Sequence, residues 1–316
     1  MRPRNSGITI TNPILDGGSG RTEGVGMTDD RAEWLAWRRD GIGASDVAAI
    51  VGLSKWASPM SVWADKTGLI TEDEDNDYLE YGRRAEPMIA GYFHDRTELY
   101  VAWPQYRAMH AVHQHHRATL DGLASETPEL NQIVSALGVV EAKTAGWKEW
   151  DEIPDAYQCQ GQWQMHVTGL PWCWFAVMHD RRFRIYELGR DDKVIRQLVG
   201  MVDAFWERHV LGGTPPPADG HDATTAAIRS AFPEAEEGKA VDITEAADAL
   251  ARLTAAKAEA KAADERVKAA QNAIKVALGE GEVGLIDGRP AVTWKSSERE
   301  GYVVKPTTVR TLRVLS

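Results

Sequence analysis

The chain has 316 residues, a net charge of −11 at pH 7 and a hydrophobic content of 43%. This length allows one large domain with an appendage, and no apolar run is long enough to cross a bilayer. Two cysteines, Cys159 and Cys173, are too few to bind an iron–sulfur cluster, and the N-terminus lacks the apolar core of a signal peptide, so a cytoplasmic protein is expected.

Residues 1–26 are rich in Gly, Ser, Thr and Asn without helical periodicity, which predicts a disordered tail. A helix with an acidic first turn is predicted over about 29–41. The stretch 41–46 then predicts a glycine-bearing turn, with Ser45 as the N-cap of a helix over 46–51. The free N–H groups of such a helix would suit a phosphate, although a capped helix without any ligand explains the pattern by itself.

A helix predicted over 78–94 carries Glu86, which taken alone would be an ordinary surface residue. Paired strands are predicted over 101–109 and 111–120. Four histidines lie near their junction: His110, His113, His115 and His116. Their spacing matches no structural zinc site and no cysteine accompanies them. We therefore expect them at a strand edge or at the surface.

The chemistry-bearing residues are Asp121 and two members of a strand predicted over 138–143. Strand alternation places Glu141 and Lys143 on one face. An acidic residue on an adjoining strand, here Asp121, would complete a site of hard oxygen ligands for Mg²⁺. The amine could orient or deprotonate a water, or neutralise charge on a reacting phosphate. This combination suits phosphodiester hydrolysis, although an ion pair on a solvated face explains most such patterns.

A helix is predicted from Pro154, at its N1 position, to about residue 168. Tyr157, Gln160 and Gln164 share one face of it, and by themselves they are a polar exposed stripe. Three further elements, a buried strand, its antiparallel partner and a helix, complete the predicted core over 172–178, 183–188 and 192–211.

A Gly- and Pro-rich boundary follows at 212–217. Beyond it, a capping box at 242–245 starts a long amphipathic helix that ends at Gly279, and its thin apolar stripe suits an arm or a weak coiled coil. Asp287 and Gly288 predict a type I′ hairpin turn. The remaining tail, with further strands expected over 302–304 and 308–314, is basic through Arg299, Lys305, Arg310 and Arg313.

Several of these motifs occur in a fixed order: 38–47 (RRDGIGASDV), 81–86 (YGRRAE), 119–122 (TLDG), 139–143 (VVEAK) and 154–162 (PDAYQCQGQ). In this order and at these intervals, the chain closely resembles the YqaJ-type viral recombinase family, to which phage lambda exonuclease belongs, within the PD-(D/E)xK nuclease superfamily. The resemblance covers about residues 29–211. It implies an α/β, restriction-endonuclease-like fold with a mixed sheet flanked by helices, followed here by a long C-terminal helix and a small β unit.

On this basis the chain divides into five segments: a disordered tail (1–26), a nuclease domain (27–213), a linker (214–241), a long helix (242–280) and a small β unit (281–316). The acidic residues gather in the stretches 72–80 and 233–265. Local positive charge for phosphate contacts therefore remains compatible with an acidic chain.

The resemblance implies Mg²⁺-dependent exonuclease activity, with Mn²⁺ able to substitute, that degrades one strand of linear double-stranded DNA from a 5′ end. The matching metal ligands are Asp121, Glu141, Glu86 and the backbone carbonyl of Ala142. By the same resemblance Lys143 activates the water, Gln160 assists it and Tyr157 buttresses the site.

The positions that match the family's 5′-phosphate contacts are Arg38 and Ser45, with the adjacent Arg39 as an alternative to Arg38. Thr119 stands where the family often has Ser, and it keeps a hydroxyl near the phosphate. The family's Arg after the Lys143 position is absent, and Lys148 is the only basic residue over 144–151, which makes it the candidate for that phosphate contact.

The family also implies a ring-shaped homotrimer, a bacterial host cytoplasm and cooperation with a phage single-strand annealing protein during recombination. Two alternatives remain open. One is an endonuclease of the same superfamily, of a restriction or junction-cleaving type. The other is a catalytically inactive module that binds DNA ends.

Overall fold

A computed structural model of the chain describes residues 9–11, 27–70, 77–102, 106–128 and 136–296. The strands expected over 302–304 and 308–314, and the basic residues of the tail from Arg299 onward, lie outside the described residues. The chain forms two compact units, one ending at Phe232 and the other starting at Pro233.

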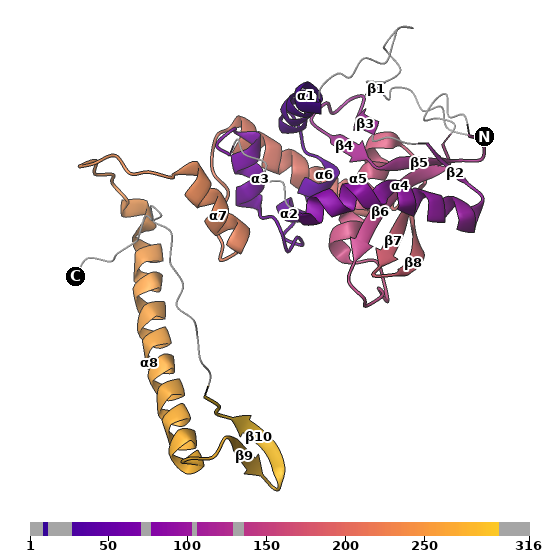
Figure 1. Cartoon of the computed structure of the whole chain (residues 1–316). Coiled ribbons are helices and arrows are strands. Elements are labelled where there is room, and N and C mark those ends of the chain that lie inside the picture. Colours follow the sequence, from indigo (N-terminus) through magenta and orange to yellow (C-terminus); the bar gives the residue numbers. More distant parts are fainter. Residues whose placement is uncertain (1–8, 12–26, 71–76, 103–105, 129–135, 297–316) are drawn as a thin grey trace. The chain divides into compact units, whose positions relative to one another are not determined.

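The first unit is built on a five-stranded mixed sheet with the order β2-β5-β6-β7-β8 (Figure 1). Its strands are β2 (Tyr100–Ala102), β5 (Gly122–Ser125), β6 (Gly138–Ala145), β7 (Trp172–His179) and β8 (Arg182–Gly189). Strands β6 and β7 are parallel, and the other neighbours are antiparallel. A parallel pair needs a crossover connection, and helix α5 (Asp155–Thr168) supplies it.

Helices cover both faces of this sheet, as predicted for the fold class: α4 (Asp77–Thr97) packs on one face and α5 on the other. The other helices of the unit are α1 (Met27–Arg39), α2 (Ala44–Ile50), α3 (Pro59–Lys66), α6 (Asp192–Phe205) and α7 (Asp222–Ala231). No helix in the described part of the chain is long and apolar enough to span a bilayer.

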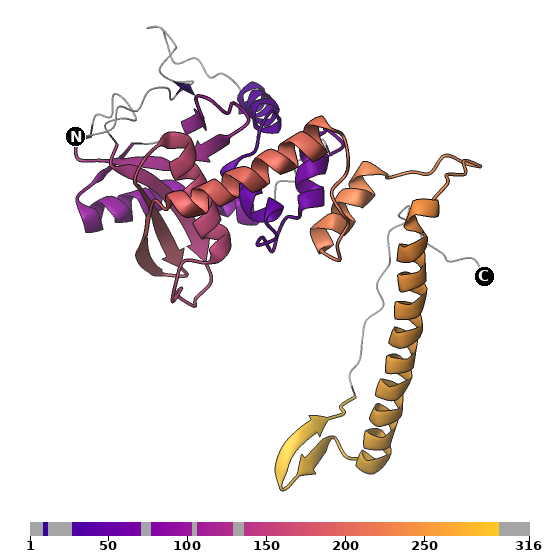
Figure 2. The same cartoon turned by 180° about the vertical axis from the view of Figure 1, so that it is seen from behind.

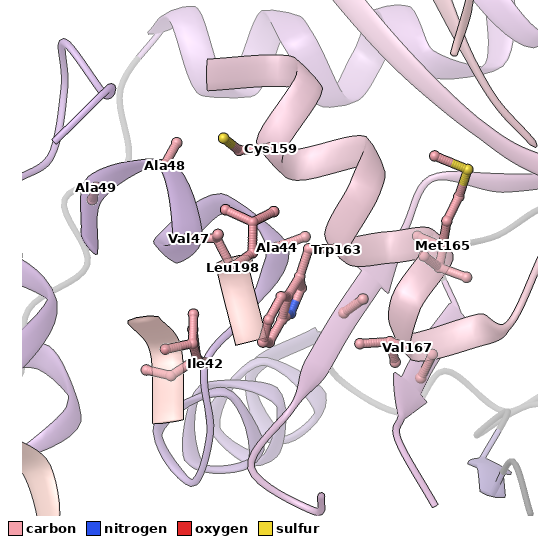
Figure 3. Packing of buried hydrophobic residues seen from close by; sticks show 14 of the residues in the cluster. Ile42, Ala44, Val47, Ala48, Ala49, Cys159, Trp163, Met165, Val167 and Leu198 are labelled. Atoms are coloured by element: carbon pink, nitrogen blue, oxygen red, sulfur yellow. The ribbon is translucent and has the colours of Figure 1, made fainter. Parts of the chain in front are cut away.

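Two hydrophobic clusters lie on opposite faces of the five-stranded sheet, because alternate residues of a strand point in opposite directions. Val139 packs with residues of α2, α3, α5 and α6, whereas Val140 and Ala142 pack with α4. The close view in Figure 3 shows part of the first cluster, in which Trp163 of α5 is grouped with Val47 of α2. Strand β6 is therefore buried on both sides as far as Ala142, so Glu141 lies within the protein, whereas Thr144 near the end of the strand is exposed.

A second, three-stranded sheet has the order β1-β3-β4, with β1 (Thr9–Thr11), β3 (Tyr106–Met109) and β4 (Arg117–Leu120), all antiparallel. Part of the tail predicted as disordered over 1–26 is therefore a strand. The predicted strand pair over 101–120 corresponds to β3 and β4, while β2 belongs to the larger sheet.

The predicted N-cap of α2 is wrong. The helix starts at Ala44 with Gly43 as its N-cap, and Ser45 lies in its first turn. The side chain that satisfies a backbone donor there is Asp46, whose Oδ2 accepts the Gly43 N–H at 2.9 Å. Helix α5 likewise starts one residue later than predicted, because Pro154 occupies the N-cap position.

Beyond α6 the chain continues as a π-helix over Trp206–Leu211. Helix α7 lies within the segment predicted as a linker and packs against α3, where the Thr224 hydroxyl donates to the Ser58 hydroxyl at 2.8 Å. The first unit thus extends further along the chain than the predicted boundary at 212–217.

The second unit contains the predicted long helix and hairpin: α8 (Ala247–Leu278), β9 (Val283–Ile286) and β10 (Arg289–Thr293), preceded by a 3₁₀ turn (Thr244–Ala246). Figure 2 shows the yellow hairpin beyond the end of the orange helix. Asp287 and Gly288 have φ values of 50° and 76°, the positive values that a type I′ turn requires. Helix α8 has no buried residue along its described length.

Candidate active site

The register between β5 and β6 brings the two predicted carboxylates together. The strands are antiparallel, with Gly122 opposite Val140, and one further step of this register sets Asp121 opposite Glu141. The Ala142 N–H donates to Asp121 Oδ2 at 2.9 Å. Asp121 is therefore held against β6 by a backbone hydrogen bond.

Lys143 lies beside Glu141, as strand alternation predicts. Its Nζ donates to Glu141 Oε1 at 2.7 Å, and Glu141 is buried. The ammonium also lies over the Tyr157 ring, 5.2 Å from the ring centroid, in a cation–π arrangement. Tyr157 thus contacts the lysine that the sequence assigns to catalysis.

Helix α5 supplies two further donors to Glu141. Gln160 Nε2 donates to Oε1 at 2.5 Å, and Gln164 Nε2 donates to Oε2 at 2.6 Å. Gln164 shares the predicted helix face of Tyr157 and Gln160, but the sequence alone assigns it no role. Its position four residues after Gln160 was the available signal, because such residues are neighbours on a helix.

The electrostatics of the site follow from three carboxylates near one ammonium. Burial raises the pKa of Asp121 well above its usual value, and the charges of Glu141 and Glu86 raise it further, against the opposing effect of Lys143. Burial alone would lower the pKa of Lys143, but Glu141 and Asp121 hold this pKa above its usual range. Lys143 is therefore an ammonium in this arrangement, and Glu86 of α4 acts on the same group of charges.

The donor set fits a hard divalent cation. Carboxylate oxygens are the ligands that Mg²⁺ prefers, and Asp121 at the junction of β4 and β5, Glu141 of β6 and Glu86 of α4 provide them. Glu141 Oε2 accepts one hydrogen bond, which leaves it a second lone pair for a cation. A cation there would also relieve the repulsion that raises the pKa of Asp121.

A cavity of about 170 Å³ lies over these carboxylates. Its lining comprises Trp34, Trp37, Arg38, Gly43, Ala44, Ser45, Arg117, Thr119, Asp121, Glu141 and Gln160. Three of the predicted 5′-phosphate contacts, Arg38, Ser45 and Thr119, are among them.

The two adjacent arginines have different environments. Arg38 lines the cavity, with its guanidinium over the Trp34 ring and 3.5 Å from Asp46. Arg39 instead contacts Asp65 at 3.6 Å and the Ile70 carbonyl at 3.4 Å. The geometry therefore favours Arg38 over Arg39 as the candidate for the 5′-phosphate contact. Lys148 is exposed and lies outside the cavity lining.

Three lining residues were not assigned from the sequence: Trp34, Trp37 and Arg117. The available signals were positional. The tryptophans lie within one helical turn before Arg38, and Arg117 precedes Thr119 by two residues, which places both on the same face of β4.

A buried ion pair supports the Arg38 end of the cavity. Lys66 Nζ lies 2.7 Å from Asp46 Oδ2 and donates to the Arg38 carbonyl at 3.1 Å. Burial would raise the pKa of Asp46, but Lys66 and then Arg38 hold it below its usual value. Asp46 is therefore ionised and connects α2, α3 and the end of α1.

Of the two positions expected for the histidines, a strand edge or the surface, the surface is wrong for His116, which is fully buried directly before β4. His110, His113 and His115 are partly buried, and His115 and His116 both contact Asp203 of α6. The sequence could not show this contact because Asp203 lies 87 residues after His116.

Comparison with known proteins gives matches over the part of the chain that holds this site. The YqaJ-like viral recombinase domain matches residues 33–171. The uncharacterized protein YqaJ of Bacillus subtilis (strain 168) is 33% identical over 225 residues, which are 68% of this chain and 68% of that protein. The chain belongs to the YqaJ-like viral recombinase family.

Solved structures similar to this family member include the alkaline exonuclease LHK-Exo from Laribacter hongkongensis. Two crystal structures of LHK-Exo, one of them in complex with dAMP, are 24% identical to the chain and give TM-scores of 0.43 and 0.44. Each match covers 56% of this chain and 91% of LHK-Exo. A phage related exonuclease from Haemophilus somnus 129PT is 13% identical over 55% of this chain and 96% of its own, with a TM-score of 0.38.

Proposed function

We propose that this YqaJ-like protein is a Mg²⁺-dependent exonuclease that degrades one strand of linear double-stranded DNA in the 5′-to-3′ direction. The observation that carries the proposal is the convergence of Asp121, Glu141 and Lys143 beneath a cavity lined by Arg38 and Ser45. The family resemblance supplies the substrate and the direction.

Asp121, Glu141 and Glu86 would hold the metal, together with the Ala142 carbonyl, and Mn²⁺ could replace Mg²⁺. When bound, the cation neutralises charge on the scissile phosphate and makes a water more acidic. Glu141 keeps its position through the two amide donors of α5, which come from Gln160 and Gln164.

The remaining chemistry belongs to side chains that line the cavity or contact a residue of its lining. Water adds to phosphorus and loses a proton to the solvent, and the bond to the leaving sugar oxygen breaks as that oxygen takes up a proton from the solvent. Lys143 offers an ammonium that can donate to a phosphate oxygen and offset its developing charge, and Gln160, which lines the cavity, orients the water. Tyr157 restrains the ammonium through its ring.

Three residues of the cavity lining, Arg38, Ser45 and Thr119, would select the DNA terminus. The Arg38 guanidinium matches a phosphate group in charge and geometry, and the hydroxyls of Ser45 and Thr119 can donate to its oxygens. Contacts from Arg39 and Lys148 are not needed in this arrangement, because neither residue lines the cavity.

Two further parts of the proposal rest on the resemblance alone. The protein would act as a homotrimer around DNA, and it would work with a single-strand annealing protein in phage-type recombination in a bacterial cytoplasm. Native mass in solution tests the first part, and co-purification with an annealing protein tests the second.

The central experiment is digestion of end-labelled, 5′-phosphorylated linear duplex with Mg²⁺. Lys143→Ala should lower the turnover rate by at least about 100-fold, whereas Lys193→Ala, at an exposed lysine of α6, should stay near wild type. A Lys143→Ala rate within a few-fold of wild type would refute the assignment. Cleavage of covalently closed circles would indicate an endonuclease, and Mg²⁺ binding without cleavage would indicate an inactive end-binding module.

A further inference from the structure

A second group of side chains of types that can bind metals lies next to α5 and includes His166 of that helix. His166 follows Gln164 by two residues, so the two side chains point to opposite sides of the helix. Around His116 the structure gathers five imidazoles and one carboxylate, from the β3–β4 connection, α5 and α6: His110, His113, His115, His116, His166 and Asp203.

Hydrogen bonds connect the buried His116 to partly buried members of this histidine cluster. His116 Nε2 lies 2.8 Å from Asp203 Oδ1, and its Nδ1 lies 3.0 Å from His166 Nε2. His115 Nε2 approaches the same Asp203 oxygen at 2.7 Å. Two imidazoles thus converge on one carboxylate oxygen, and Asp203 links the β3–β4 connection to α6.

Three members of the cluster are spaced for a cation. His113, His116 and Asp203 each offer one ligand atom, and these atoms all lie within 4.8 Å of one another. In a tetrahedral site with bonds of roughly 2.0–2.2 Å, ligand atoms lie about 3.3 Å apart. A cation would widen the 2.8 Å separation between His116 Nε2 and Asp203 Oδ1. His113 is only partly buried, so its ring has room to turn.

The ligand types indicate the class of cation. Imidazole nitrogen favours Zn²⁺ and similar transition metals over Mg²⁺.

We propose that His113, His116 and Asp203 form a site for a first-row transition-metal ion of the Zn²⁺ type, with the fourth position left to water, distinct from the carboxylate site of Asp121 and Glu141. The site would fix the β3–β4 connection to α6. This connection holds the segment that leads into α2, because the Ile42 N–H donates to the His115 carbonyl at 2.6 Å and the Arg117 N–H donates to the Ile42 carbonyl at 3.0 Å.

The test is Zn²⁺ titration by calorimetry of chelator-stripped, tag-free protein carrying Asp121→Asn, which removes a ligand of the carboxylate site. We expect one equivalent of Zn²⁺ to bind and the thermal unfolding midpoint to rise. Co²⁺ in place of Zn²⁺ should give visible d–d absorption from a site with imidazole ligands. These measurements need no DNA or nuclease activity, so the proposed function can fail without affecting them.

The decisive variant is His113→Asn, because His113 is partly exposed and its replacement should leave the core intact. It should weaken Zn²⁺ binding by at least about 10-fold. His94→Asn is the matched control, since His94 is a partly buried histidine whose Nδ1 bonds the Leu99 carbonyl elsewhere in the fold. Absence of Zn²⁺ binding in the Asp121→Asn protein, or unchanged affinity after His113→Asn, would overturn the proposal.

Discussion

Gln164 donates a hydrogen bond of 2.6 Å to Glu141, and both side chains are buried between α5 and β6. Gln162, two residues earlier on the same helix, is also buried, but its amide bonds the Gly189 carbonyl at 2.8 Å and the Asp191 N–H at 2.9 Å. The two glutamines therefore share residue type, helix and burial, and only one of them contacts the proposed metal ligand.

This difference predicts separate effects on stability and activity. Gln164→Met and Gln162→Met should each cost about 1–3 kcal/mol of unfolding free energy, because each leaves buried groups without a partner. Only Gln164→Met should also lower the turnover rate on linear duplex, by at least about 10-fold. Urea unfolding and single-turnover digestion measure the two effects. Full turnover by a folded Gln164→Met protein would contradict the role given to Gln164.

Arg38 and Arg39 offer a second matched pair. If Arg38 binds the 5′-phosphate, Arg38→Ala should lose a charged hydrogen bond worth about 1.5–3 kcal/mol, or roughly a 10- to 150-fold lower rate on 5′-phosphorylated ends. The rate on 5′-hydroxyl ends should change little, so the preference between ends disappears. Arg39→Ala should keep that preference because Arg39 contacts Asp65 and Ile70 outside the cavity. A loss of preference in Arg39→Ala alone would reverse the assignment.

The part of the site that the sequence predicts is the part set by local rules. Glu141 and Lys143 share a face because strands alternate with a period of two. Asp121 meets them because β5 and β6 pair antiparallel immediately after it. Likewise, the Asp287-Gly288 turn depends only on two positive φ angles.

The parts that the sequence analysis missed depend on contacts between distant segments. Ser45 is a good N-cap residue, yet Asp46 takes over the capping, and its orientation is held by Lys66, twenty residues later. His116 is buried because α6 packs over it and presents Asp203. No local pattern around residues 45 or 116 contains these partners, so periodicity and spacing could not reveal them.

Mg²⁺ should stabilise the protein through Asp121. A ligand that binds only the folded state at 100 times its Kd adds about 2.7 kcal/mol of stability. Wild type should show this gain in thermal unfolding, and Asp121→Asn should not. The raised pKa of Asp121 means that its ionised form is unfavourable in the metal-free fold, so Asp121→Asn without Mg²⁺ should unfold at a higher temperature than wild type.

Asp155→Asn serves as the control for this measurement, because Asp155 is an exposed carboxylate in the first turn of α5. It should respond to Mg²⁺ as wild type does. An equal Mg²⁺ response in the Asp121→Asn protein would show that the cation binds elsewhere.

The buried pair of Asp46 and Lys66 predicts a stability effect with a defined pH range. Asp46→Asn removes the 2.7 Å partner of the buried Lys66 ammonium, which keeps Asp65 at 3.3 Å. The cost at pH 7 should therefore stay below the roughly 3–5 kcal/mol of a fully unpaired buried charge. The pKa of Asp46 is held below its usual value of 3.8 by Lys66 and Arg38, against the effect of burial. Its stabilising contribution is therefore complete above that usual value and is lost as the pH falls through the lowered pKa.

The stability difference between wild type and Asp46→Asn should accordingly stay constant from pH 7 to about pH 5 and narrow only in strongly acidic solution. Urea unfolding followed by tryptophan fluorescence at each pH measures this difference. Glu152→Gln, at an exposed carboxylate, should show almost no difference from wild type across the same range. A difference that already shrinks between pH 7 and pH 5 would mean that the pKa of Asp46 is raised rather than lowered, and that Lys66 does not hold the carboxylate that anchors the Arg38 end of the cavity.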